Sequence, residues 1–180
     1  MITIISGTNR PDSSTLKIAR AVEGIYRNLE VETCLLDLQE LPQQIFDPSS
    51  YAIKPVGFTQ FTQPILESKG LVIVTPEYNG GPPGVLKYFI DMLPFPESFE
   101  HRPVAFVGLA AGMWGGLRPV EQLQQIFGYR NAHIFPDRVF MPGIMSLLSD
   151  ESKLKSGLEW ELLEKQCKDF VHFSKALEKQ

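Results

Sequence analysis

The sequence has few of the residues that bind metals or form disulfides. Its 180 residues include only two cysteines, Cys34 and Cys167, which lie far apart and outside any CxxC motif. Its three histidines are equally isolated. Zinc sites and disulfide-rich domains instead carry closely spaced or numerous cysteines. We therefore expect two free thiols and no metal site.

The sequence also lacks a cluster of positive charge and a long apolar run. The formal net charge is −4, and no group of Lys and Arg stands out, which argues against a nucleic-acid-binding surface. No apolar segment approaches the ~20 residues needed to span a bilayer, and the first residues resemble a strand rather than a signal peptide. We expect a cytoplasmic protein with neither a nucleic-acid nor a membrane partner.

Strand-like and helix-like segments alternate along the chain. Strands are predicted at 2–6, 31–38, 70–76 and 103–109 and, less regularly, within 133–142; helices at 14–29, 58–68, 83–93 and 117–127 and over most of 150–180; and a proline-rich loop at 42–57. The runs "LVIV" and "VAFV" suit strands that are covered on both faces, and the alternating run 31–38 suits a strand near the edge. This pattern predicts one α/β domain over residues 1–180, with a five-stranded parallel sheet between helices.

Three chemically unusual loops follow the first, third and fourth predicted strands. In a doubly wound sheet, ligands bind beyond the carboxyl ends of the strands, so these loops are expected to meet at one crevice. The first loop, "SGTNRPDSST", ends at a helix start, where unpaired N–H groups favour an anion, and it adds hydroxyl groups and Arg10. The alternative is that Ser13 or Ser14 is only an N-cap and that Arg10 is a solvated surface residue.

The second loop, "TPEYNGGPPG", and the third, "LAAGMWGGLR", are rich in glycine and proline. In the second loop, Tyr78 and Asn79 stand just past the strand end, either at a ligand or in a tight turn with Tyr78 on the surface. The small residues of the third loop allow a planar ligand to approach the backbone. Trp114, among glycines, suits either a lid or a contact between subunits.

On these motifs the sequence resembles the NAD(P)H-dependent FMN reductases, which include chromate-, quinone- and azo-reducing flavoproteins. The motifs are "GTNRPDSST", "TPEYNGGPPGVLKYFID" and "GMWGGLR", and the resemblance covers roughly residues 1–145. It implies a flavodoxin-like, three-layer α/β/α fold with strand order 2-1-3-4-5, a tightly bound FMN, and NAD(P)H as co-substrate. It also implies a homodimer or homotetramer that reduces a small-molecule acceptor by a ping-pong mechanism.

The resemblance also assigns residues to the cofactor. The FMN phosphate would be held by Thr8, Arg10, Ser13, Ser14 and Thr15. The isoalloxazine would be bordered on one side by Pro76, Glu77, Tyr78, Asn79 and Gly80, largely through backbone N–H groups, and on the other by Ala110, Ala111 and Gly112. Tyr78 and Trp114 are candidates for the substrate side. Catalytic acid–base residues are not expected, because N5 of FMN carries the hydride, and Glu77 is expected to be structural or interfacial rather than catalytic.

Three other functions share parts of this pattern. A flavodoxin-type electron carrier is the main alternative, although the first loop is longer than a carrier's and contains Arg10. A receiver-like signalling domain would need an acidic cluster after the first strand, and a protein of the same fold without flavin would be colourless. In the helix "GVLKYFIDML", Tyr88, Phe89 and Met92 exceed what one core face needs, which predicts at least a dimer.

Overall fold

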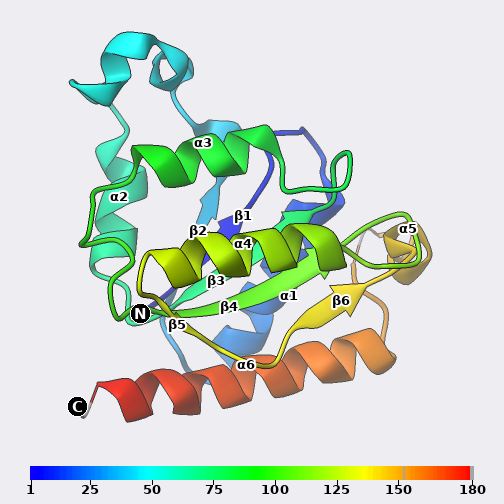
Figure 1. The fold of residues 1–180 in the computed structure, drawn as a ribbon. Helices are drawn as coiled ribbons and strands as arrows, with labels where there is room; N and C mark the ends of the chain where they lie inside the picture. Colours follow the sequence, from blue (N-terminus) through cyan, green and yellow to red (C-terminus); the bar gives the residue numbers. More distant parts are fainter. Residues whose placement is uncertain (152, 179–180) are drawn as a thin grey trace.

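The computed structural model describes residues 1–151 and 153–178, and its centre is a parallel β-sheet (Figure 1). The strands are β1 (Ile2–Ser6), β2 (Thr33–Asp37), β3 (Leu71–Pro76), β4 (Pro103–Leu109), β5 (His133–Ile134) and β6 (Val139–Met141). Their order is β2-β1-β3-β4-β5, with β6 also paired to β4. The predicted α/β fold and strand order are therefore confirmed, as is the edge position of the second strand.

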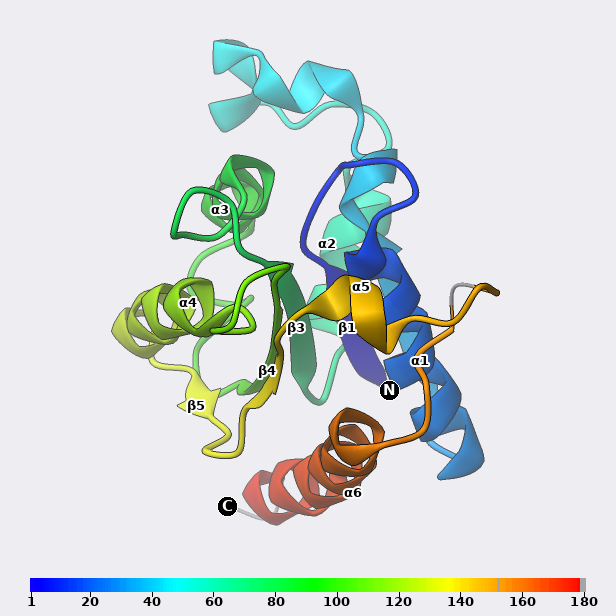
Figure 2. The same ribbon diagram turned by 90° about the vertical axis from the view of Figure 1, so that its right-hand side faces the viewer.

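Helices cover both faces of the sheet (Figures 1 and 2). They are α1 (Ser14–Asn28), α2 (Thr59–Leu66), α3 (Gly84–Met92), α4 (Leu117–Tyr129), α5 (Ile144–Leu147) and α6 (Leu158–Leu177). Helices α2, α3 and α4 share one buried core with the sheet, and α1 and α6 share another. None of the described helices is long and apolar enough to cross a membrane.

The sequence of α1 explains both its start and its orientation. The Ser13 hydroxyl accepts a hydrogen bond of 3.1 Å from the Leu16 N–H and so caps the helix. Ile18, Val22 and Ile25, at helical spacing, are buried against the sheet. The capped end lies directly after β1, so the first turn of α1 reaches the carboxyl edge of the sheet.

The segment 42–57, predicted as a loop, contains two short 3₁₀ helices, Gln43–Phe46 and Pro48–Tyr51. It projects at the top of the molecule, in cyan, next to α3 (Figure 1). The Tyr88 hydroxyl of α3 donates a 2.9 Å hydrogen bond to the Ile45 carbonyl, which ties the segment down.

This packing removes the reason given above for a dimer. Phe89 and Met92 are not surplus apolar surface, because both are buried within this chain. The Phe89 ring contacts Phe58 and Phe61, beside and within α2, at centroid distances of 6.1 and 6.2 Å. The inference from this helix to a dimer is therefore wrong, whereas the oligomeric state itself stays a prediction.

The last, irregular strand is divided into β5 and β6, both of which pair with β4. β5 pairs with residues 103–104 and β6 with residues 107–109. The buried Gln166 of α6 fills the gap between them by donating hydrogen bonds to the carbonyls of Phe106, at 3.0 Å, and Asp137, at 2.9 Å. The side-chain amide of Gln166 thus takes the place of backbone hydrogen bonds where the pairing of β4 with the last strand is interrupted.

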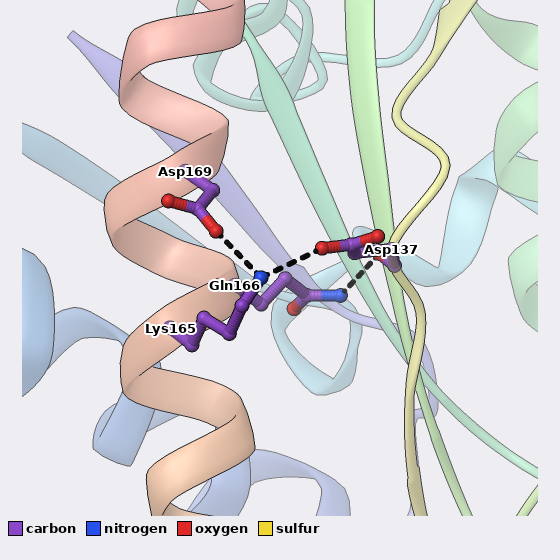
Figure 3. A network of polar contacts seen from close by, with 4 residues as sticks. All are labelled: Asp137, Lys165, Gln166 and Asp169. Carbon is purple, nitrogen blue, oxygen red and sulfur yellow. Dashed lines mark hydrogen bonds and ion pairs between the residues drawn. The ribbon is translucent and has the colours of Figure 1, made fainter.

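An ion-pair network lies beside this glutamine (Figure 3). The Lys165 ammonium is 3.1 Å from the carboxylate of Asp137 and 2.7 Å from that of Asp169. Both ion pairs are solvent-exposed, and such pairs contribute little stability. The buried amide of Gln166 is therefore the main polar attachment between α6 and the divided strand.

We expect Gln166→Met to destabilise the protein by about 1–3 kcal/mol, because it leaves the buried carbonyl of Phe106 and the partly buried carbonyl of Asp137 without their donor. The measurement is the urea midpoint at an unchanged m-value. Gln125→Met, on the exposed face of α4, is the matched control and should change stability by less than about 0.5 kcal/mol. Equal losses in the two variants would contradict this role of Gln166.

The two free thiols differ in burial and in reactivity. Burial raises the pKa of Cys167 to about 12, and burial together with the charge of Glu23 raises the pKa of the half-buried Cys34. Because the thiolate is the reactive form, we expect native protein at pH 8 to take up a thiol reagent at Cys34 alone, and Cys167 to react only after unfolding. Mass-spectrometric counting of labels tests this, and rapid labelling of both thiols in native protein would contradict it.

The same pKa shift makes stability depend on alkaline pH. An unfolded Cys167 ionises near its usual value of 9.0, whereas the folded thiol keeps its proton to about 12. Above pH 9 the unfolded state therefore binds fewer protons than the folded state, and the contribution of Cys167 to the free energy of unfolding falls as the pH rises. Below pH 9 both states are protonated, and the contribution is constant.

Candidate functional site

The three unusual loops meet at the carboxyl edge of the sheet, as the sequence predicts. They surround a hollow of about 530 Å³. From the predicted set, the hollow is lined by Arg10, Ser13, Ser14, Thr15, Pro76, Glu77, Tyr78, Ala110 and Ala111. At this crevice the chain after β1 continues to β2 on one side, and the chain after β3 continues to β4 on the other. Ligands bind at such a point in folds of this type.

The part of the hollow next to α1 is suited to an anion. Within the described residues, the backbone N–H groups of Ser13, Ser14 and Thr15 make no hydrogen bond to the chain. The Ser13 hydroxyl accepts from Leu16 and keeps its own proton for a ligand. Ser13 is therefore an N-cap, as the alternative interpretation had it, and remains a donor as well.

Two cations border this end of the hollow. The exposed guanidinium of Arg10 and the half-buried ammonium of Lys17 both line it, and neither forms a salt bridge within the part of the chain that the structure describes. Lys17 was not among the predicted residues. Its signal in the sequence is its distance of one helical turn from Ser13 and Ser14, which places it beside the same helix end.

Thr8, which the resemblance assigns to the FMN phosphate, lies behind the lining of the hollow. Its side chain is buried and does not line the hollow. The Thr8 hydroxyl lies 3.0 Å from the Tyr78 hydroxyl and accepts a 3.3 Å hydrogen bond from the Arg10 N–H. Thr8 therefore joins the first loop to the second and fixes the start of the segment that carries Arg10.

The second loop is a tight hairpin. Tyr78 and Gly81 exchange backbone hydrogen bonds of 2.9 and 3.1 Å, and the φ angles of Asn79 and Gly80 are +52° and +77°. Positive φ at both central residues is typical of a type I′ turn, for which Asn-Gly is the preferred pair. Pro76, Glu77 and Tyr78 line the hollow, whereas Asn79 and Gly80 form the turn and do not.

This hairpin limits the backbone donors that the second loop has for a ligand. Pro76 has no N–H, Glu77 donates its N–H to the Leu109 carbonyl at 3.1 Å, and Tyr78 donates to Gly81. Among the described residues, only the N–H groups of Asn79 and Gly80 in this stretch lack an intrachain acceptor. Backbone N–H contacts from residues 76–80 to a flavin, as the resemblance implies, would therefore come from these two turn residues.

Glu77 carries a polar atom without a partner. Its Oε1 lies 3.8 Å from an Arg118 guanidinium nitrogen, and its side chain is only 15% exposed. Its Oε2 is buried and has no hydrogen-bond partner among the described residues. A buried carboxylate oxygen without a donor is costly, so a ligand with an N–H or O–H group at this wall of the hollow would stabilise it.

The third loop folds back over the end of β4. Cβ atoms at Gly108 and Gly116 would lie within 3.0 Å of the backbone, and Gly116 has a φ of +87°. Ala110 and Ala111 line the hollow, but Gly112 and Trp114 do not. The side chain of Trp114 is 55% exposed, so it is not a core residue.

The fourth wall was missed from the sequence. Ile144 and Met145, in the short helix after β6, line the hollow, and the Ser14 hydroxyl lies 3.8 Å from the Met145 sulfur. Because β6 ends at the same edge as the other strands, its loop reaches the same crevice. The irregular pattern of residues 133–142 did not show where this strand ends.

Comparison with known proteins agrees with this architecture. The family model described as NADPH-dependent FMN reductase matches residues 1–144. The chain is 27% identical over 143 residues to the NADPH azoreductase of Bacillus sp. (strain OY1-2), covering 79% of this chain and 77% of that protein. It is 27% identical over 157 residues to a quinone reductase of Pseudomonas putida, covering 85% and 83%.

A solved structure shows the same fold over nearly the whole chain. The flavoenzyme NAD(P)H:(acceptor) oxidoreductase FerB from Paracoccus denitrificans superposes with a TM-score of 0.79 at 20% identity, covering 97% of each chain. The family match, over residues 1–144, includes all three loops of the site and the helix α1. The chain therefore belongs to the NADPH-dependent FMN reductase family, whose members are oxidoreductases with FMN as cofactor and NAD(P)H as co-substrate.

Proposed function

We propose that this chain transfers a hydride from NAD(P)H through FMN to a small-molecule acceptor, by a ping-pong mechanism in which both substrates use the same flavin face in turn. The acceptors are of the quinone, azo or flavin class, which is supported by its relatives, named as azo, FMN and quinone reductases. The observation that carries the proposal is the anion-binding helix end with Arg10, beside a hollow walled by small residues and a tyrosine.

The residues of the hollow fit FMN. The phosphate suits the free N–H groups and hydroxyls of Ser13, Ser14 and Thr15, with Arg10 as a charged donor. The planar ring suits the walls made by Pro76, Tyr78 and the two alanines. An imide N–H such as that of the isoalloxazine would give the buried Oε2 of Glu77 its missing donor.

FMN supplies the hydride chemistry when it is bound, so the chain has to bind, orient and shield it. The Thr8–Tyr78 contact holds the first two loops together on either side of the hollow. Among the described residues, the N–H group of Ala111 has no intrachain acceptor, and Ala111 lines the hollow, so this group would be a donor for charge on the ring edge. No acid–base residue is assigned a catalytic role.

A flavodoxin-type electron carrier remains the alternative, and one experiment separates the two functions. The visible spectrum of the purified protein is recorded with FMN, then after NADPH under anaerobic conditions, then after a quinone. We expect a flavin spectrum that NADPH bleaches and the quinone restores. A flavin that stays oxidised in both NADPH and NADH would contradict the reductase function and favour the carrier.

Arg10→Ala tests the phosphate site. We expect it to weaken FMN binding by about tenfold to a hundredfold and to leave riboflavin binding nearly unchanged, since riboflavin has no phosphate. Ser13→Ala should act in the same direction but less. Fluorescence titration of both flavins is the measurement, with Arg138→Ala, another exposed arginine, as control. Equal losses for FMN and riboflavin would rule out a phosphate contact.

Trp114→Ala tests the substrate side. Because its side chain is exposed and outside the hollow, we expect unchanged thermal stability and FMN affinity but a several-fold change in kcat/KM for quinones. Tyr129→Ala, an exposed aromatic residue on α4, is the control and should leave quinone turnover unchanged. A Trp114→Ala variant with normal turnover and normal assembly would show that this side chain has neither role.

We propose further that the protein is a homodimer or homotetramer. Exposed large apolar side chains support this, among them Phe95, Met113 and Trp114, which are 62%, 76% and 55% exposed. Light scattering should give a mass of at least about twice the chain mass of 20.3 kDa. A mass of one chain at micromolar concentration would contradict it.

A further inference from the structure

A second groove runs along the outer face of α1, next to the hollow of the candidate FMN site. It has a volume of about 590 Å³ and lies between α1 and a second wall formed by Glu151, Lys153, Leu154 and Trp160. Figure 2 shows residues 153–157, in orange, passing beside α1. Lys17 lines both the groove and the hollow, so the two adjoin.

The groove carries positive charge that the chain does not neutralise. Of its four cations, Arg27 and Lys153 are each paired with a glutamate, at 3.6 and 2.7 Å. Lys17 and Arg20 form no salt bridge within residues 1–151 and 153–178. The free charge thus lies at the end of the groove nearest the hollow.

The floor of the groove is open in the middle of the helix. Gly24 stands at the centre of α1, where glycine is less favourable than alanine by about 1 kcal/mol, and a Cβ atom there would meet nothing within 4 Å. Packing therefore does not explain this glycine. Together with Ala21 it leaves a shallow floor, and the half-buried ring of Trp160 stands beside it.

We propose that this groove binds the adenosine 2′-phosphate end of NADPH. Lys17 and Arg20 bind the 2′-phosphate, and the adenine lies over Gly24 and against the ring of Trp160. Arginine is a common partner of this phosphate because its planar fork matches phosphate oxygens. Lys17 and Gly24 are separated by about 10 Å along the helix, a suitable span for this part of a dinucleotide whose other end enters the hollow.

This assignment rests on the proposed function and makes it more specific, because NADH lacks the 2′-phosphate and so gains nothing from Lys17 and Arg20. The chain should therefore prefer NADPH to NADH, chiefly through KM. The alternative is that Lys17 and Arg20 belong to a solvated basic face of α1 that binds no ligand. This alternative predicts equal use of the two dinucleotides.

The first test uses the FMN-loaded protein and two nucleotide fragments. In calorimetry, adenosine 2′,5′-bisphosphate should bind at least about tenfold more tightly than adenosine 5′-phosphate, and it should compete with NADPH. Arg20→Gln should raise KM for NADPH by about tenfold and leave KM for NADH within about twofold. Lys168→Gln, which removes one exposed charge from a neighbouring groove, is the control and should change neither.

A second variant blocks the groove without removing charge. Gly24→Leu favours the helix and should keep or raise the melting temperature, while it weakens binding of adenosine 2′,5′-bisphosphate. Unchanged binding in both Gly24→Leu and Arg20→Gln would overturn the assignment, as would equal losses for NADPH and NADH in Arg20→Gln. If the protein oxidises neither dinucleotide and yet binds FMN, the proposed function fails instead, which separates the two failures.

Discussion

A helix cannot satisfy the N–H groups of its own first turn, and the candidate site is built on that constraint at α1. The Ser13 hydroxyl accepts a hydrogen bond from the Leu16 N–H, and within the part of the chain that the structure describes the N–H groups of Ser14 and Thr15 have no acceptor. The start of α1 lies at the carboxyl edge of the sheet, between β1 and β3, whose following connections run to opposite sides of the sheet. The charge and hydroxyl content of the first loop follow from what such an end binds, namely an anion.

Elsewhere at this edge, the backbone of the loops lies very close to the backbone of the strands, and the loops can therefore form the walls of the hollow. A Cβ at Gly7 would lie 2.8 Å from the Val74 carbonyl oxygen, so only glycine allows the first loop to start against β3. At the third loop, a Cβ at Gly116 would lie 2.5 Å from the Leu109 N–H nitrogen. The glycines therefore bring the loops against the strand ends, and Met113 and Trp114 in the third loop are exposed to solvent.

The sequence predicts the parts of this structure that depend on local pattern and misses those that depend on distant contacts. Strands with continuous apolar runs and the capped helix α1 appear within about two residues of their predicted bounds. The division of the last strand depends on Gln166, which lies more than twenty residues further along the chain. The burial of Phe89 depends on α2, and the role of Thr8 on a hydroxyl seventy residues away. No window of sequence contains these partners.

The distribution of charge also depends on contacts that a sequence window does not contain, and this affects function. The chain has a net charge of −4 and no run of basic residues, and on this ground the sequence predicts no broad basic surface. Yet Arg10, Lys17 and Arg20 border two adjoining cavities, because the loop and then the turns of α1 place them on one side. Spacing of three or four residues on a helix disperses such charges in the sequence and gathers them in space. A small anionic cofactor and a small anionic co-substrate need only this local field, which an overall negative charge does not remove.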